Sequence, residues 1–171
     1  MTFISFYLGI FTRYACCIAL TIASASAEEV LLPQKGLTLN AQLNLAPGKK
    51  LTDGAILIVH GGLSHRDTEI GTALQSQLNQ KGYTTLAINL SLGIDGRHGM
   101  YDCQVPHRHR NGDAADEIGT WVDWLKKQGA KRVALLGHSR GGAQTALYAT
   151  EQNPRLVTAQ ALMAPAIREN T

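Results

Sequence analysis

The sequence predicts an α/β fold with a mostly parallel sheet and helices on both faces. Short apolar runs typical of buried strands alternate with segments that have the apolar spacing of amphipathic helices. This alternation is typical of a parallel sheet, because parallel strands are joined by crossover helices. The chain has 171 residues, of which 44% are hydrophobic and 17% are charged. That length and composition suit one domain with a hydrophobic core.

Five segments have the pattern of strands. Between residues 28 and 47, leucine and alanine occupy alternate positions from Leu37 to Leu45, the period of a strand or of one hairpin arm. Continuous apolar runs predict buried strands at residues 55–59, 84–90, 133–136 and 156–163.

Three segments between these strands predict helices. Asp67 or Thr68 caps a helix that ends at Gly82, and Asp113 caps a helix over residues 114–128. A third helix covers residues 140–152 and stops before a proline. The expected buried stripes are, in order, Ile70, Ala73, Leu74 and Leu78; Ile118, Trp121, Val122 and Leu125; and Ala143, Ala146, Leu147 and Tyr148.

The strongest chemical signal lies between the fourth strand and the third helix. Gly137-His138-Ser139-Arg140-Gly141 is a G-x-S-x-G in a strand–turn–helix context. A serine on so sharp a turn takes a strained backbone conformation, which holds its hydroxyl above the edge of the sheet. The helix N-terminus behind it supplies partial positive charge to an oxyanion. We therefore predict that Ser139 is a nucleophile. The alternative is a glycine-rich turn that happens to contain a serine.

A second glycine-rich turn, His60-Gly61-Gly62, follows the strand at residues 55–59. In parallel α/β sheets, binding sites lie at the carboxyl ends of the strands. Since both turns directly follow strands, we expect them to meet at the same edge of the sheet. The alternative is a simple turn at the end of a strand.

GHSRGG on a strand–turn–helix, with His60-Gly61-Gly62 after an earlier strand, resembles the α/β-hydrolase family. The resemblance runs from about Val30 to the C-terminus and covers only the first part of that fold. It implies a serine hydrolase acting on carboxylic esters or related acyl compounds, without a cofactor. The backbone N–H groups of Arg140 and Gly62, with Leu63 as second choice, are then the expected oxyanion donors.

The acid and the histidine of a catalytic triad cannot be placed in this sequence. In the family they follow the serine in that order. No histidine follows Ser139, and the only later acids are Glu151, inside a predicted helix, and Glu169. The earlier histidines either support local structure, at positions 60 and 138, or lack a recognisable orienting acid, at positions 65, 98, 107 and 109. We therefore expect a C-terminally incomplete fold, either a truncated copy or a fragment.

Residues 90–112 form the one long irregular segment, which is expected to overhang the site because it leaves the carboxyl end of a strand. Its histidines and cysteine suggest a metal site, but their spacing matches no common zinc pattern; they are His98, Cys103, His107 and His109. A solvated basic loop containing Arg97, Arg108 and Arg110 is the preferred interpretation. No metal is expected.

Residues 1–27 have the pattern of a signal peptide, followed by a hydrolase-like domain over residues 28–171. Residues 3–27 are apolar apart from Arg13 and small hydroxylated residues, and Ala25-Ser26-Ala27 matches an A-x-A cleavage site. We predict cleavage after Ala27, export to the periplasm or medium, and no membrane span in the mature chain. The alternatives are a retained membrane anchor and a lipid-modified cysteine. Cys103 would be the only cysteine left.

The formal net charge of +3 is too small to argue for nucleic acid or an anionic membrane as a partner. The expected partner is a small acyl substrate. Two functions remain: an exported serine hydrolase, and a catalytically inactive hydrolase-like domain that binds an acyl ligand or a protein partner. The missing base favours the second for this chain.

Overall fold

A six-stranded sheet forms the centre of the molecule, and the computed structural model describes residues 27–166. The strand order is β1-β2-β4-β3-β5-β6. The strands β4, β3, β5 and β6 run parallel, and the β1–β2 hairpin pairs antiparallel with β4. The predicted mostly parallel sheet is therefore confirmed. The strands are β1 (Ala27–Gln34), β2 (Leu37–Asn44), β3 (Ala55–Val59), β4 (Thr85–Asn89), β5 (Val133–His138) and β6 (Val157–Met163).

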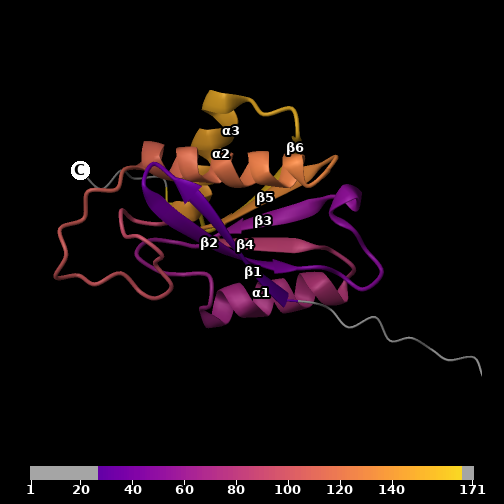
Figure 1. The fold of residues 1–171 in the computed structure, drawn as a ribbon, viewed down its shortest axis with the longest axis horizontal. Coiled ribbons are helices and arrows are strands. Elements are labelled where there is room, and N and C mark those ends of the chain that lie inside the picture. Colours follow the sequence, from indigo (N-terminus) through magenta and orange to yellow (C-terminus); the bar gives the residue numbers. More distant parts are fainter. Residues whose placement is uncertain (1–26, 167–171) are drawn as a thin grey trace, which may run out of the picture.

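Helices cover both faces of the sheet, as predicted. The helix α1 (Glu69–Gln80) lies on one face, whereas α2 (Asn111–Lys127) and α3 (Arg140–Gln152) lie together on the other (Figure 1). A short 3-10 turn, η1 (Leu51–Asp53), precedes β3. The core lies between the sheet and the α2–α3 layer, where the predicted stripe of α2 is fully confirmed: Ile118, Trp121, Val122 and Leu125 are all buried.

The start of α2 differs from the prediction. The helix begins at Asn111, and Asp113 is its third residue instead of the residue before it. The Asp113 carboxylate accepts a hydrogen bond from the backbone N–H of Arg110 at 2.8 Å, so it caps the helix from within its first turn. Asp113 therefore still satisfies a free N–H group at the helix start. The sequence pattern does not tell whether it does so from the residue before the helix or from the third residue within it.

The predicted apolar face of α1 is wrong in its first turns. Ile70 is 50% exposed and Ala73 is also exposed, while the polar Gln75 is buried. The Gln75 amide donates to the backbone oxygen of Gln42 at 3.1 Å and to the Thr85 hydroxyl at 3.2 Å. The helix is therefore attached to β2 and β4 partly by hydrogen bonds, which apolar spacing cannot predict.

The two outer strands differ in how they are covered. The alternate positions Leu39, Ala41 and Leu43 of β2 are buried, which confirms the period-two pattern. Within residues 27–166, β6 pairs on one side only, with β5, and residues 158–162 are exposed. This leaves an open edge that invites further pairing.

The parallel strands give the molecule two distinct edges. The carboxyl edge holds the segments that follow β3, β4, β5 and β6, and it contains both glycine-rich turns. The amino edge holds the connections that lead into these strands. No helix within residues 27–166 is long and apolar enough to cross a membrane. Apart from Ala27, the predicted signal peptide lies outside the described residues.

Candidate active site

Ser139 lies alone between β5 and α3, and its backbone is strained. Its φ of 52° and ψ of −121° fall where a residue with a side chain rarely sits, at a cost of about 1–3 kcal/mol. Three hydrogen bonds hold it there. Its N–H donates to Met163 at 2.9 Å, and its carbonyl accepts from Gly142 at 2.9 Å and from Ala166 at 3.0 Å. The side chain is partly exposed.

The two glycine-rich turns meet as predicted. A Cβ atom on Gly61 would lie 2.8 Å from the Cβ of Ser139, and one on Gly141 would lie 2.3 Å from the carbonyl oxygen of His60. Real Cβ atoms do not approach other atoms so closely, so hydrogen is the only tolerated side chain at both positions. Gly61 and Gly141 therefore allow the turn after β3 to pack directly against the serine turn.

Backbone N–H groups are available beside Ser139. Those of Gly62 and Leu63 have no acceptor among the described residues, and no atom lies within 4 Å of the position of a Gly62 Cβ. Arg140 is the first residue of α3, so its N–H lacks a helical acceptor. The helix dipole adds partial positive charge at the same place. The predicted donors thus lie on the two turns that touch each other.

His60 is buried and serves the turn that it begins. Burial, reinforced by the nearby Arg97 cation, lowers the pKa of His60 to about 3. The unprotonated Nε2 lies 3.1 Å from the backbone N–H of Leu90 and 3.0 Å from the Arg97 guanidinium, both of which can only donate. A ring nitrogen that accepts two hydrogen bonds cannot collect a proton from Ser139. The expectation that His60 supports local structure is therefore confirmed.

A buried polar network at this edge was not predicted. The Arg66 guanidinium contacts Asn40 at 2.6 Å and Glu29 at 2.9 Å, and its backbone N–H donates to Asn89 at 2.7 Å. Asn89 also donates to Asn40 at 2.8 Å and to the carbonyl of Arg97 at 3.2 Å. One signal was visible: Asn89 is a polar residue in the otherwise apolar end of a buried strand.

A second buried cluster lies beside it. Glu117 accepts hydrogen bonds from the Ser91 backbone N–H at 2.7 Å, from the Ser91 hydroxyl, and from His109 at 3.0 Å. All three residues are less than 9% exposed. The sequence offers no orienting acid for His109, whereas the structure supplies one from α2. The interpretation of residues 90–112 as a solvated basic loop is wrong for Arg97 and His109, which are buried, and holds for Arg108 and Arg110.

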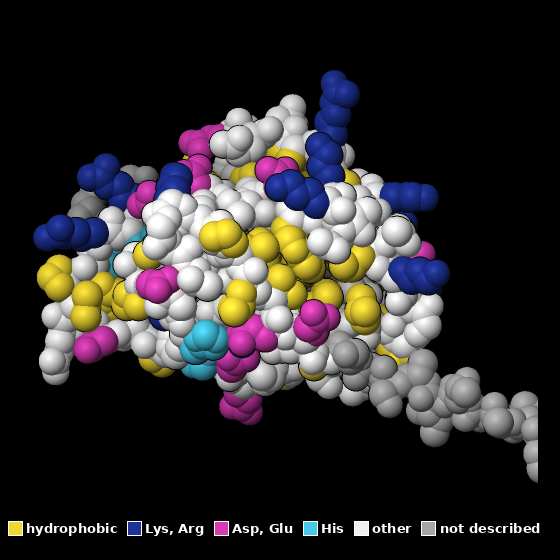
Figure 2. Space-filling model, viewed as in Figure 1, with side chains coloured by type: hydrophobic (Ala, Val, Ile, Leu, Met, Phe, Trp, Pro, Cys, Tyr) yellow, Lys and Arg dark blue, Asp and Glu magenta, His cyan; other side chains and the backbone are white. Residues whose placement is uncertain are grey.

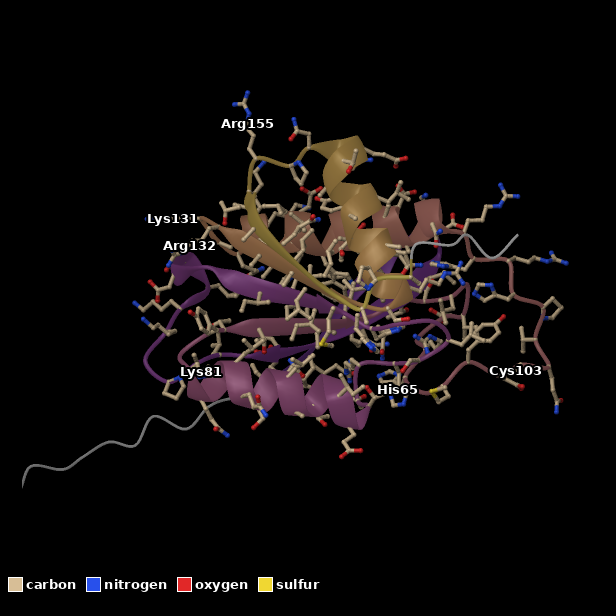
Figure 3. All side chains as sticks on the ribbon, turned by 180° about the vertical axis from the view of Figure 1, so that it is seen from behind. His65, Lys81, Cys103, Lys131, Arg132 and Arg155 are labelled. Atoms are coloured by element: carbon tan, nitrogen blue, oxygen red, sulfur yellow. The ribbon has the colours of Figure 1, made fainter. Side chains whose placement is uncertain are left out.

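No histidine within residues 27–166 hydrogen-bonds the Ser139 hydroxyl, and no three His, Cys, Asp or Glu residues there form a metal site. His98 is 2.8 Å from Glu29 and therefore also has an acid partner. His65 and Cys103 lie at the carboxyl edge, at the right of Figure 3. The structure thus brings together the predicted nucleophile and the predicted donors, and no described residue is placed to act as their base.

A family model described as the alpha/beta hydrolase fold matches residues 54–171, which is more than half of the chain. The chain belongs to the alpha/beta hydrolase family. No curated protein matches the sequence.

Solved structures of hydrolases share the fold at low sequence identity. Est1E from Butyrivibrio proteoclasticus, solved with ferulic acid bound, has a TM-score of 0.67 and 24% identity over 80% of this chain. The esterase Pf2001 from Pyrococcus furiosus gives 0.65 and 20% over 82%, and a dienelactone hydrolase from Anabaena variabilis gives 0.64 and 24% over 82%. The chain spans 52%, 52% and 64% of these three proteins.

Proposed function

We propose that this chain carries the nucleophile half of a serine hydrolase that acts on carboxylic esters or related acyl compounds. The observation that carries the proposal is the strained backbone of Ser139, held against a turn where the N–H groups of Gly62 and Leu63 have no acceptor within residues 27–166. Strain of this kind persists only where surrounding contacts enforce it, and it is common at active sites. Membership of the hydrolase family and the esterase structures that share the fold support the same reaction class.

The geometry suits acyl transfer in two steps. The Ser139 oxygen would attack the carbonyl carbon of an ester while a base takes its proton, giving a tetrahedral intermediate with a negatively charged oxygen. The N–H groups of Arg140 and Gly62 would donate to that oxygen. Collapse then expels the alcohol, which takes the proton back, and water later releases the acid from Ser139.

We place the triad acid and histidine outside residues 27–166. Within that range, His60 accepts two donors, and His98 and His109 are each paired with a carboxylate. None of them reaches the Ser139 hydroxyl. The chain also spans only about half of the two esterase structures compared above. A base from elsewhere agrees best with these observations.

A second function is favoured by the same missing base. A chain without a histidine at Ser139 would be a catalytically inactive hydrolase-like domain that binds an acyl ligand or a protein partner. The exposed edge of β6, where Leu162 is 43% exposed, gives such a domain a surface for a partner.

Export belongs to the proposal as well. The apolar segment ends in Ala25-Ser26-Ala27, and β1 begins at Ala27, so cleavage after Ala27 would remove only the first residue of the sheet. N-terminal sequencing of the protein recovered from its host should begin at Glu28. An intact Met1 in a membrane fraction would contradict cleavage.

The test of the hydrolase proposal is ester hydrolysis by a chain extended through a downstream acid and histidine. Ser139→Ala should abolish turnover of a p-nitrophenyl ester, because no other group can form the acyl intermediate. Ser76→Ala, on the exposed side of α1, is the matched serine control and should keep full activity. Unchanged hydrolysis by the Ser139→Ala variant would refute Ser139 as nucleophile.

A further inference from the structure

Exposed cations gather at the amino edge of the sheet. Each of the four connections into β3, β4, β5 and β6 contributes at least one, and every lysine of the chain except Lys35 is among them. All are exposed: Lys49, Lys50, Lys81, Lys126, Lys127, Lys131, Arg132 and Arg155. We call these eight residues the basic edge. Figure 3 shows Lys81, Lys131, Arg132 and Arg155 at the end of the molecule opposite His65 and Cys103.

These charges are not neutralised by neighbours. Within residues 27–166, no residue of the basic edge forms an ion pair. Asp53 lies at this edge, but its carboxylate accepts from the backbone N–H of Lys50 at 3.0 Å, and its carbonyl accepts from Arg132 at 3.1 Å. In the space-filling view, Lys and Arg side chains project at both ends of the molecule, and the basic edge accounts for those at the amino-edge end (Figure 2). The formal net charge of +3 therefore understates the positive charge at this one edge.

Three of the cations converge on one hollow. A cavity of about 510 Å³ at this edge is lined by Lys49, Lys81 and Arg132, which come from three different connections. Asp53, Tyr83, Thr84 and Thr158 also line it. Three cations against one carboxylate give the hollow a net positive potential that favours an anion. Hydroxyl groups beside them offer further hydrogen bonds to phosphate oxygens.

The N-terminal segment joins the fold at this same edge. Ala27, the first residue of β1, pairs with Asn44, and Asn44 pairs with Thr85 at the start of β4. Ala27, the first described residue, therefore lies beside the basic edge. Arg13 is the only charged residue in the sequence before it. Before the proposed cleavage after Ala27, the apolar segment and the polybasic surface would act together at a membrane, because two such signals reinforce each other. After cleavage the basic edge acts alone.

We propose that the basic edge docks on an anionic phospholipid surface, with a headgroup phosphate in the hollow between Lys49, Lys81 and Arg132. The carboxyl edge, with Ser139, would then face away from the bilayer. A small soluble anion would contact only the three cations that line the hollow. A broad, planar anionic surface would contact cations on all four connections at once. Attraction to such a surface requires no buried contact, and it weakens as salt shortens the Debye length.

The test measures the binding of the full chain to lipid vesicles. The readout is the ratio of partition constants for vesicles of phosphatidylcholine mixed with phosphatidylglycerol and for vesicles of phosphatidylcholine alone. Any insertion of the apolar segment before Ala27 would raise both partition constants, so its effect largely cancels in their ratio. Each Lys or Arg near an anionic surface contributes about fivefold, so Lys81→Gln with Arg155→Gln should lower the ratio by roughly 25-fold.

Two controls keep the test specific. Lys35→Gln with Arg108→Gln removes the same charge at the carboxyl edge and should leave the ratio unchanged. Lys81→Arg with Arg155→Lys retains the charge and should also leave it unchanged. Equal ratios for the basic-edge variant and the wild type, or an equal loss in the carboxyl-edge control, would overturn the proposal. A different anionic ligand would also overturn it. In that case the basic-edge variant would lose saturable binding of inorganic phosphate or duplex DNA, while its vesicle ratio would equal that of the wild type.

Discussion

The two edges of the parallel sheet use charge in opposite ways. At the carboxyl edge, Arg66 and Arg97 are 7% and 5% exposed, and hydrogen bonds to carbonyl, amide, imidazole or carboxylate groups satisfy their guanidinium groups. At the amino edge, every residue of the basic edge is exposed, and none has an ion-pair partner within residues 27–166. Both edges are built from connections of the same strands, so the fold itself does not impose the difference.

The difference between the edges shows where this fold buries charged groups despite the loss of their hydration. Removing a guanidinium from water is unfavourable in free energy. Hydrogen-bond and ion-pair partners offset this loss only when their geometry is good. Arg97 contacts His60, whose turn packs against the serine turn. Arg66 hydrogen-bonds Asn40 of β2 and Asn89 of β4. At the amino edge no such precision is needed, because a charge that acts through solvent on a planar surface need not be fixed in place.

The largest expected effect comes from breaking the close approach at the carboxyl edge. Gly141→Ala places a Cβ atom 2.3 Å from the His60 oxygen and 2.7 Å from the Val59 oxygen, both of them backbone atoms that cannot move alone. We expect a loss of about 3 kcal/mol or more in unfolding free energy, measured by urea denaturation. Gly112→Ala, in the first turn of α2 with no atom within 4 Å, should change it by no more than about 1 kcal/mol.

A smaller loss is expected when the buried carboxylate is neutralised. Glu117→Gln keeps the shape, but its NH₂ group cannot accept the hydrogen bonds that Ser91 and His109 donate to the carboxylate. Unfolding free energy should fall by about 2–3 kcal/mol. Glu151→Gln, exposed near the other edge, is the matched change and should stay within about 0.5 kcal/mol. Equal losses of unfolding free energy in Glu117→Gln and Glu151→Gln would show that the buried carboxylate at the carboxyl edge matters no more to stability than an exposed one at the amino edge.

Acid should weaken the carboxyl edge through His60. Its pKa is about 3 in the fold and 6.5 ordinarily, so below pH 6.5 the unfolded chain binds a proton that the folded chain does not. The contribution of neutral His60 to the unfolding free energy is therefore fully present above pH 6.5. It falls by about 1.4 kcal/mol per pH unit as pH decreases toward 3. The lowered pKa values of His107 and Glu29 act in the same direction.

The measurement is the pH dependence of urea midpoints for the wild type and His60→Gln. The variant is expected to be less stable throughout, because it loses contacts to Leu90 and Arg97, but its stability should change less between pH 6.5 and 5. Above pH 7 the difference between the two proteins should be constant. Parallel curves over the whole acid range would show that His60 is not held neutral by the fold.

Periodicity and turn chemistry predict most of the fold, because the buried strands and the α2 stripe repeat at regular spacing. The same signals predict the place of Ser139 and of the turn at His60, since each depends on residues adjacent in sequence. They cannot predict Arg66 contacting Glu29, or Glu117 contacting Ser91, because these pairs lie 37 and 26 residues apart and depend on tertiary packing. They failed at Gln75 for a related reason, since a buried amide interrupts an apolar face.

We propose that Ser139 at the carboxyl edge performs acyl transfer only when a base from outside residues 27–166 is present. Labelling with a fluorophosphonate probe tests this directly, because the probe reacts with activated serines. We expect labelling of the chain extended through a downstream acid and histidine, and its loss in Ser139→Ala. The 171-residue chain should label almost not at all, since loss of a triad histidine costs on the order of 10⁶ in turnover. Strong labelling of the 171-residue chain at Ser139 would contradict the claim and make one of its own histidines the base.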